Sequence, residues 1–272
     1  MVAWQESDLS INGRKVQYYR AGVRGKPPVI LLHGFTNNGL MWTPLVRDLE
    51  ADYDLVALDA AGHGRSDYPG PDPAPDQARD DVIAVIRHLA LARPALVGHS
   101  MGAGTASAVA AHLGDGIRCA VLEDPGWRDA AGATPPPGAV GTPEWVSVIR
   151  TLPALPPEER AAFAQQTNPG WSEEDRALWI EARVQFDQRL LARMGRRPWG
   201  DWRAVARAIT CPVLLLTADV ARGAIVTPAA AREAAGLLRA GQVVQIPNAG
   251  HNIRRDNYPA YRDAVRAFLQ AH

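Results

Sequence analysis

The chain has 272 residues, enough to bury a sizeable core in one large domain or two small ones. Its 29 basic and 29 acidic residues balance, which argues against a general electrostatic attraction to nucleic acid or to an anionic membrane. The cysteines Cys119 and Cys211 are too few for a disulfide framework or a metal cluster, and each adjoins an apolar run, so we expect both to be buried.

The first residues and the lengths of the apolar runs indicate where in the cell the protein is expected. The first residues, MVAWQESDLS, lack the basic and then apolar segments of a signal peptide. No apolar run approaches the ~18 residues of a membrane helix. We therefore expect a cytoplasmic monomer or homodimer that acts on a small molecule, with no nucleic-acid or membrane partner.

The first part of the chain predicts strands that alternate with helices. Asn12-Gly13 is typical of a tight turn between two short alternating segments in residues 7–22. Continuous apolar runs of the kind buried in parallel sheets follow at residues 28–32 and 54–59. A Pro- and Asp-rich loop is expected at residues 68–76. The expected helices of this part comprise residues 40–49 and 78–91.

The most informative stretch is residues 95–106, ALVGHSMGAGTA. It begins as a buried strand, turns at Gly98-His99-Ser100-Met101-Gly102 and continues as small, helix-compatible residues. Gly-x-Ser-x-Gly between a strand and a helix is the pattern of a nucleophile elbow. The pattern predicts Ser100 at the tip of a strained turn, with the helix N-terminus behind it.

The remainder predicts more sheet on either side of a helical insertion. Six of the chain's eight Trp residues lie in residues 126–205, where we find amphipathic segments and no buried-strand run. Strands are expected at residues 117–125, 212–219 and 242–246, and helices at residues 228–238 and 259–269. The alternation predicts an α/β fold with a mainly parallel sheet and right-handed crossovers.

Four motifs together resemble the α/β-hydrolase superfamily: His33-Gly34-Phe35, Gly62-His63-Gly64-Arg65-Ser66, Gly98-His99-Ser100-Met101-Gly102 and Gly250-His251. The resemblance covers residues 7–270 and implies an eight-stranded, mostly parallel sheet flanked by helices, with a helical cap inserted after the sixth strand. The implied organisation is a core of residues 1–125 and 206–272 and a cap of residues 126–205.

The chemistry follows from residue types. A serine hydroxyl needs a base within hydrogen-bond reach, and His251, in a small-residue loop after a strand, is the expected partner of Ser100. By resemblance, the backbone N–H groups of Phe35 and Met101 form the oxyanion hole. His33 and His63 are expected to brace the backbone.

The acid that orients His251 departs from the commonest pattern. Most relatives carry an Asp a few residues before a segment that corresponds to Ala224-Ile225-Val226-Thr227-Pro228, but that position falls near Gly223. A minority, including one subgroup of haloalkane dehalogenases and a lactonase for zearalenone, use a strand-end Glu, and Glu123 resembles it. We therefore expect Glu123, with Asp219 and Asp124 as alternatives.

The cap is expected to bind and select the substrate. Phe35, His99 and Trp127 are the predicted substrate-binding side chains, and the aromatic content favours an apolar substrate. No metal-ligand spacing, phosphate loop or dinucleotide fingerprint is visible, so no cofactor is expected.

The leading interpretation is a cofactor-independent serine hydrolase that cleaves an ester or lactone through an acyl-enzyme. One alternative is a carbon–carbon bond hydrolase, or a lyase or cyclase, that uses the same Ser–His–acid site. Another is a small-ligand receptor without catalysis, against which an intact Ser100 and His251 argue.

Overall fold

The computed structural model describes residues 2–128, 144–193 and 201–272. Its centre is a sheet with strands in the order β1-β2-β4-β3-β5-β6-β7-β8. The strands are β1 (Gln5–Ile11), β2 (Arg14–Gly22), β3 (Pro28–Leu32), β4 (Asp54–Leu58), β5 (Ala95–His99), β6 (Ala120–Glu123), β7 (Val213–Thr217) and β8 (Gly241–Gln245). β2 runs antiparallel to β1 and β4, and all other pairs are parallel.

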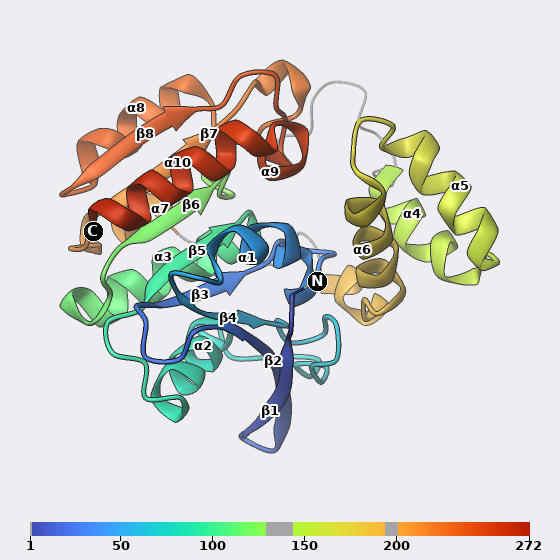
Figure 1. Cartoon of the computed structure of the whole chain (residues 1–272), viewed down its shortest axis with the longest axis horizontal. Helices are drawn as coiled ribbons and strands as arrows, with labels where there is room; N and C mark the ends of the chain where they lie inside the picture. Colours follow the sequence, from blue (N-terminus) through green and yellow to red (C-terminus); the bar gives the residue numbers. More distant parts are fainter. Residues whose placement is uncertain (1, 129–143, 194–200) are drawn as a thin grey trace.

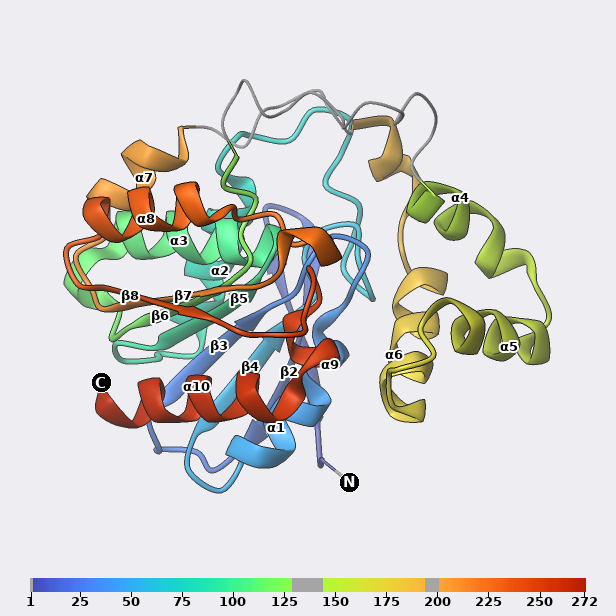
Figure 2. The ribbon, with the colours of Figure 1, turned by 90° about the horizontal axis from the view of Figure 1, so that it is seen from above.

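Helices cover both faces of this sheet (Figures 1 and 2). They are α1 (Thr43–Leu49), α2 (Gln77–His88), α3 (Met101–Leu113), α7 (Trp202–Ala208), α8 (Pro228–Leu237), α9 (Ile253–Asp256) and α10 (Tyr258–Ala271). Figure 2 shows α1 and α10 on one face and α3, α7 and α8 on the other. The buried residues divide in the same way into two large apolar clusters, one on each face of the sheet.

The strand sequences explain this burial. The central strands β3, β4, β5 and β7 are almost wholly buried, as continuous apolar runs between two helical layers must be. At the first turn of the sheet, Asn12 and Gly13 both have positive φ, as the Asn-Gly pair predicted. The predicted burial of Cys119 and Cys211 is confirmed.

The helical insertion follows β6, as predicted, and lies to one side of the sheet (Figure 1). Its helices are α4 (Glu144–Thr151), α5 (Pro157–Thr167) and α6 (Glu173–Val184). Trp179 of α6 packs in an apolar cluster with Met41, which belongs to the 3₁₀ turn η1 (Gly39–Trp42) of the core. The predicted boundaries at residues 125 and 205 stay predictions, and the Pro/Gly-rich stretch 132–143 lies outside the described residues.

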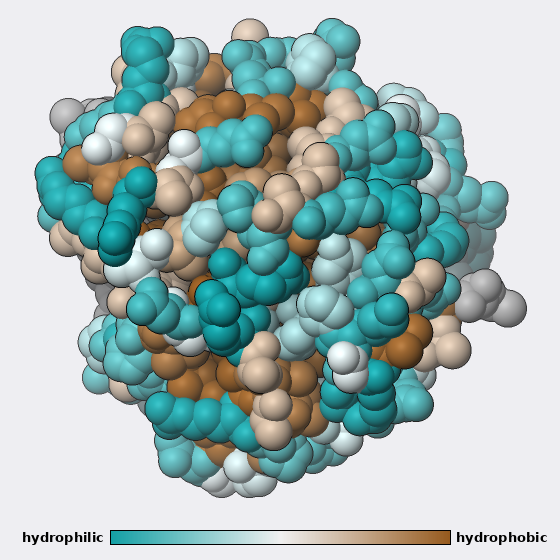
Figure 3. Space-filling view, turned by 60° about the vertical axis from the view of Figure 1, so that its left-hand side comes forward, coloured by the Kyte–Doolittle hydropathy of each residue, from teal (hydrophilic) through white to brown (hydrophobic). Residues whose placement is uncertain are grey.

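Figure 3 shows one face of the surface, on which apolar side chains gather near the top and near the bottom, with polar and charged residues between them. The exposed large apolar side chains of the described ranges are Val23, Val184 and Val220, far apart in the chain. Among the described helices, none combines the length and the apolar character needed to cross a bilayer.

Candidate active site

Ser100 occupies the turn between β5 and α3. Its backbone has φ 53° and ψ −112°, a strained conformation for a residue with a side chain. The flanking glycines permit this turn, because a Cβ on Gly98 would lie 2.4 Å from the carbonyl oxygen of Gly102 and one on Gly102 would lie 2.0 Å from that of Leu32. The predicted strand–turn–helix geometry of the Gly-x-Ser-x-Gly motif is therefore present.

A chain of hydrogen bonds runs from Ser100 to a buried carboxylate. The Nε2 atom of His251 lies 3.0 Å from the Ser100 hydroxyl oxygen, and its Nδ1 atom lies 2.6 Å from Oδ2 of Asp124. The imidazole is half-buried, whereas the Asp124 side chain is fully buried. A serine hydroxyl, an imidazole and a carboxylate in this sequence can abstract the serine proton and stabilise the resulting imidazolium.

Asp124 is held by backbone donors as well. Its Oδ2 atom accepts from the N–H of Ile225 at 2.8 Å and its Oδ1 atom from the N–H of Val226 at 2.9 Å. The resemblance implied an acid shortly before the segment 224–226, but this segment instead donates to Asp124, which follows β6. These bonds keep the buried carboxylate in place beside His251.

The expectation that Glu123 contacts His251 is wrong. Glu123 is the last residue of β6, and Asp124 follows it with φ 41°. The strand ends between the two residues, and their carboxylates face different partners, His251 for Asp124 and Arg254 for Glu123. Glu123 accepts from the backbone N–H of Arg254 at 3.1 Å and pairs with the Arg254 guanidinium at 3.1 and 3.2 Å.

This second carboxylate belongs to a buried ion pair. Burial raises the pKa of Glu123, and the charge of Arg254 opposes that rise. The Arg254 guanidinium also lies over the Trp42 ring, 4.7 Å from its centroid. Glu123 thus anchors α9, the short helix that begins two residues after His251.

Asp219, the other alternative, does not reach His251 either. Its Oδ2 atom accepts from the N–H of Asn248 at 3.0 Å and its Oδ1 atom from the side chain of Gln245 at 3.2 Å. It therefore holds the loop between β8 and His251. Gly223, where the usual acid would stand, has φ 97° and no side chain.

Two buried histidines connect the loops behind Ser100. His33 Nε2 accepts from the N–H of Ala60 at 2.9 Å, and its Nδ1 lies 2.8 Å from the carbonyl oxygen of Gly34. The Nδ1 of His63 lies 3.1 Å from the carbonyl oxygen of Ala61. Burial lowers the pKa of His33 to about 4 and that of His63 to about 3, so both are neutral at pH 7. These bonds agree with the predicted bracing role.

The predicted substrate contact of His99 does not fit its position. The side chain is buried at 2% exposure and its Nε2 bonds to the backbone carbonyl of His251 at 2.9 Å. The two rings lie 4.7 Å apart between centroids. His99 therefore supports the His251 loop from beneath.

Trp127 is also placed differently from the prediction. It is 3% exposed and stacks on Trp202 of α7, with ring centroids 5.1 Å apart and an interplanar angle of 11°. Both rings belong to the apolar cluster on the α3 face of the sheet. Trp202 of α7 therefore covers the Trp127 ring, which packs in the core of the sheet domain.

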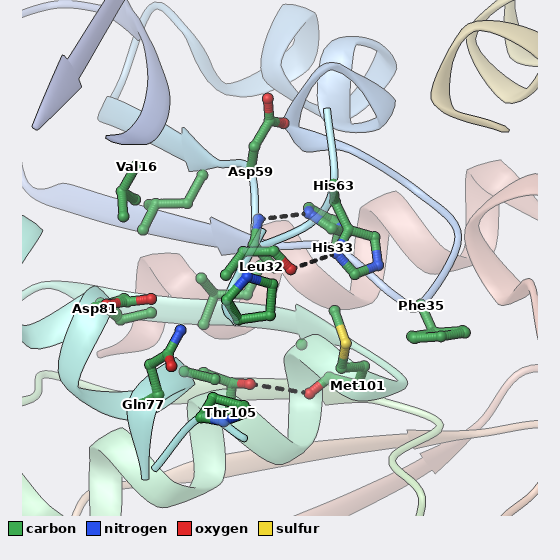
Figure 4. Close-up of a pocket in the computed structure, with 18 of the residues that line it drawn as sticks. Val16, Leu32, His33, Phe35, Asp59, His63, Gln77, Asp81, Met101 and Thr105 are labelled. Carbon is green, nitrogen blue, oxygen red and sulfur yellow. Dashed lines mark hydrogen bonds between the residues drawn. The ribbon is translucent and has the colours of Figure 1, made fainter. Parts of the chain in front are cut away.

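Phe35 and Met101 come together at a cavity of about 520 Å³ (Figure 4). Met101 is the first residue of α3, where backbone N–H groups lack intrahelical acceptors. Phe35 follows the end of β3, and its ring meets those of His63 and Phe186 edge to face. The assignment of their N–H groups to an oxyanion hole stays a prediction.

Sequence reasoning missed the backbone donors at residues 225–226, and it allowed Glu123 an Arg partner without identifying Arg254. A signal for the pair was present, since an acid at a buried strand end needs a cation and Arg254 follows His251 by three residues. No group of three or more His, Cys, Asp or Glu side chains that could hold a metal ion occurs within residues 2–128, 144–193 and 201–272.

Comparison with known proteins identifies the family to which the chain belongs. The model described as "Alpha/beta hydrolase family" matches residues 29–268. N-formylmaleamate deformylase of Pseudomonas putida KT2440 is 29% identical over 265 residues, which cover 96% of this chain and 95% of that protein.

Solved structures share the fold of this chain. The enol-lactonase of Burkholderia xenovorans LB400 has a TM-score of 0.75 and 25% identity, with 97% of this chain and 100% of that chain covered. E-2-(acetamidomethylene)succinate hydrolase also has a TM-score of 0.75, with 22% identity and 98% and 99% of the two chains covered.

Proposed function

The chain belongs to the alpha/beta hydrolase family, and from this premise we propose that it is a serine hydrolase. It cleaves a carboxylic ester or lactone of a small, largely apolar molecule through an acyl-enzyme on Ser100. The observation that carries the proposal is the hydrogen-bonded series Ser100–His251–Asp124 at the tip of a strained strand–helix turn.

The first half-reaction forms the acyl-enzyme. The Ser100 hydroxyl attacks the carbonyl carbon while His251 Nε2 accepts its proton. Asp124 stabilises the imidazolium through Nδ1, and the backbone N–H groups of Phe35 and Met101 stabilise the oxyanion. When the tetrahedral intermediate collapses, His251 returns the proton to the departing alcohol oxygen.

The second half-reaction releases the acid. A water molecule takes the place of the alcohol, His251 removes its proton, and the resulting hydroxide attacks the acyl carbon. Collapse of the second intermediate restores the Ser100 hydroxyl with the proton from His251. The sequence of steps needs no cofactor, because all proton transfers use His251.

A second candidate is amide hydrolysis by the same residues. It is favoured by the relative of nearly equal length, which is named an N-formylmaleamate deformylase. The acyl-enzyme step is the same, with nitrogen as the leaving atom.

The test is a panel of p-nitrophenyl esters, simple lactones, N-formyl amides and β-diketones. We expect the parent to cleave esters or lactones, and Ser100→Ala to lose about 10⁶-fold in kcat. Ser147→Ala, an exposed serine of α4, is the matched control and should keep parental rates. Cleavage of the diketones alone would favour carbon–carbon hydrolysis, and ligand binding without any turnover would favour a receptor.

A further inference from the structure

A cavity lies next to the Ser100 turn, at the edge of the sheet formed by β2, β3 and β4. Its floor is formed at the ends of β2, β3 and β4 by Val16, Leu32 and Leu58. Its walls come from α2, from the proline-rich loop 69–75 and from the first turn of α3. Figure 4 shows Phe35 and Met101 at one end of the lining and Val16 and Asp81 at the opposite end. Its volume of about 520 Å³ is ample for the larger part of a small substrate.

Asp59, Asp81 and Thr105 in this lining are hydrogen-bonded within the protein, whereas the buried Nε2 atom of His63 has no partner among the described residues. Asp81 pairs with Arg14 at 2.7 Å, and the Thr105 hydroxyl donates to the Met101 carbonyl at 3.2 Å. Asp59 accepts from the Tyr19 hydroxyl at 3.0 Å and from the N–H groups of Gly39 and Arg65 at 2.6 and 2.8 Å. A polar group placed beside Asp59, Asp81 or Thr105 would lose its hydrogen bonds to water and find these three side chains engaged, whereas an alkyl group has no hydrogen bonds to lose.

The sheet order decides which part of the substrate lies in this cavity. From β5, which carries Ser100, the strands β6, β7 and β8 lie on one side, and β3, β4 and β2 lie on the other. Asp124 and His251 follow β6 and β8, whereas the cavity lies at the ends of β3, β4 and β2. His251 Nε2 must protonate the leaving group, so the leaving group lies on the β6–β8 side. The oxyanion and the acyl group therefore lie away from His251, toward the end of the cavity that Phe35 and Met101 line.

We propose that this cavity is an acyl pocket, and that the substrate is an ester whose acyl part is an extended alkyl chain. The inference rests on the proposed function for the direction of the chain. Each methylene that the cavity removes from water adds about 4-fold to binding when fully buried. The p-nitrophenyl hexanoate ester should therefore be a better substrate than the acetate, by at least ~10-fold in kcat/KM.

The pocket can be blocked from α2. Ala78 lies in the first turn of this helix and lines the cavity, so Ala78→Trp places a large ring in the path of the chain. Arg87→Trp is the matched control, because Arg87 is exposed and lies nine residues further along the same helix, on its opposite face. Ala78→Trp should lower kcat/KM for the hexanoate ester at least ~10-fold and change that for the acetate less than ~3-fold. Arg87→Trp should change neither.

Equal losses for both esters, or no loss for either, would overturn the acyl pocket. A second measurement does not depend on turnover. In the Ser100→Ala background, calorimetry should show that methyl hexanoate binds more tightly than methyl acetate, and that Ala78→Trp removes this difference. If this binding pattern holds but the parent cleaves neither esters nor lactones, the proposed reaction is wrong, and the binding of an alkyl chain in this cavity stands. If the parent cleaves esters but the pattern is absent, the pocket is wrong and the reaction stands.

Discussion

The two sides of Ser100 use their polar residues differently. On the β6–β8 side, His251 connects the serine hydroxyl to Asp124, and the imidazole is half-exposed. On the β3–β4 side, His33 and His63 are buried and neutral, and they connect loops. The same residue type thus contacts a hydroxyl and a carboxylate where it is half-exposed, as our proposed proton transfer requires, and holds the backbone where it is buried. The difference shows why motif histidines must be assigned by their partners.

On the β6–β8 side of Ser100, the largest effect on kcat is expected at Asp124. Asp124→Asn should lower kcat for ester hydrolysis about 10⁴-fold, because the amide no longer favours the productive imidazole tautomer. Asp219→Asn is the matched control, since Asp219 holds the same loop without touching His251, and it should cost much less. Steady-state kinetics with p-nitrophenyl acetate measures both. A larger loss in Asp219→Asn would reverse the assignment.

Substitution of the neighbouring carboxylate, Glu123, should lower the stability of the fold more than the rate of catalysis. Glu123→Ala leaves the Arg254 charge buried without its partner and should lower the free energy of unfolding by about 3–5 kcal/mol. Urea denaturation at pH 7 measures this loss. Glu123→Gln, which retains an acceptor for the Arg254 N–H, should fold with a smaller loss and keep kcat near that of the parent. A collapse of kcat in a folded Glu123→Gln would mean that this residue serves His251 after all.

The buried histidines predict an acid-sensitive fold. Because the pKa of His63 is lowered to about 3 in the folded protein, only the unfolded chain takes up this proton as pH falls through about 6.5. The free energy of unfolding therefore decreases as pH falls from about 6.5 to about 3. Between pH 7 and pH 5 the decrease that is due to His63 amounts to about 2 kcal/mol.

His63→Asn should remove the part of the pH-dependent loss of stability that is due to His63. The free energy of unfolding of the variant should fall by about 2 kcal/mol less than that of the parent between pH 7 and pH 5. His88→Asn, at an exposed position of α2, should leave the pH dependence unchanged. Urea titrations at the two pH values measure the difference, and an unchanged dependence in His63→Asn would show that His63 is charged in the folded state.

The smallest expected effect concerns the contact between the helical insertion and the His251 loop. Asp256 accepts from the Trp171 indole N–H at 3.0 Å and from the N–H of Gly250 at 2.8 Å. Trp171→Phe removes the indole donor and keeps an aromatic ring, so it should cost about 1 kcal/mol or less in unfolding. Thermal denaturation measures this cost, and a loss above about 3 kcal/mol would show that the ring itself is essential to the packing.

The fold was predictable because its signals are local. Each buried strand is a continuous apolar run, and each turn motif follows such a run at short range. The local Gly-x-Ser-x-Gly motif predicted Ser100, and the order of the motifs predicted His251 as its partner. The structure brings these two side chains within hydrogen-bond distance.

The choice of acid was not predictable in the same way. Glu123 and Asp124 are adjacent, so the position of the strand end decides which one faces His251. That decision also depends on Arg254 and on the N–H groups of residues 225 and 226, which are far away in the chain. Likewise, the position of Trp127 depends on its stacking with Trp202, a long-range contact that carries no local pattern.

The most direct test of the account is the mass of the Ser100 peptide after the protein reacts with a p-nitrophenyl ester and is quenched in acid. We expect the peptide that contains Ser100 to gain the mass of the acyl group. The gain should be absent in Ser100→Ala and present in Ser147→Ala. An acyl group on another residue, or ester turnover without any acylated peptide under conditions where deacylation is slow, would contradict the account.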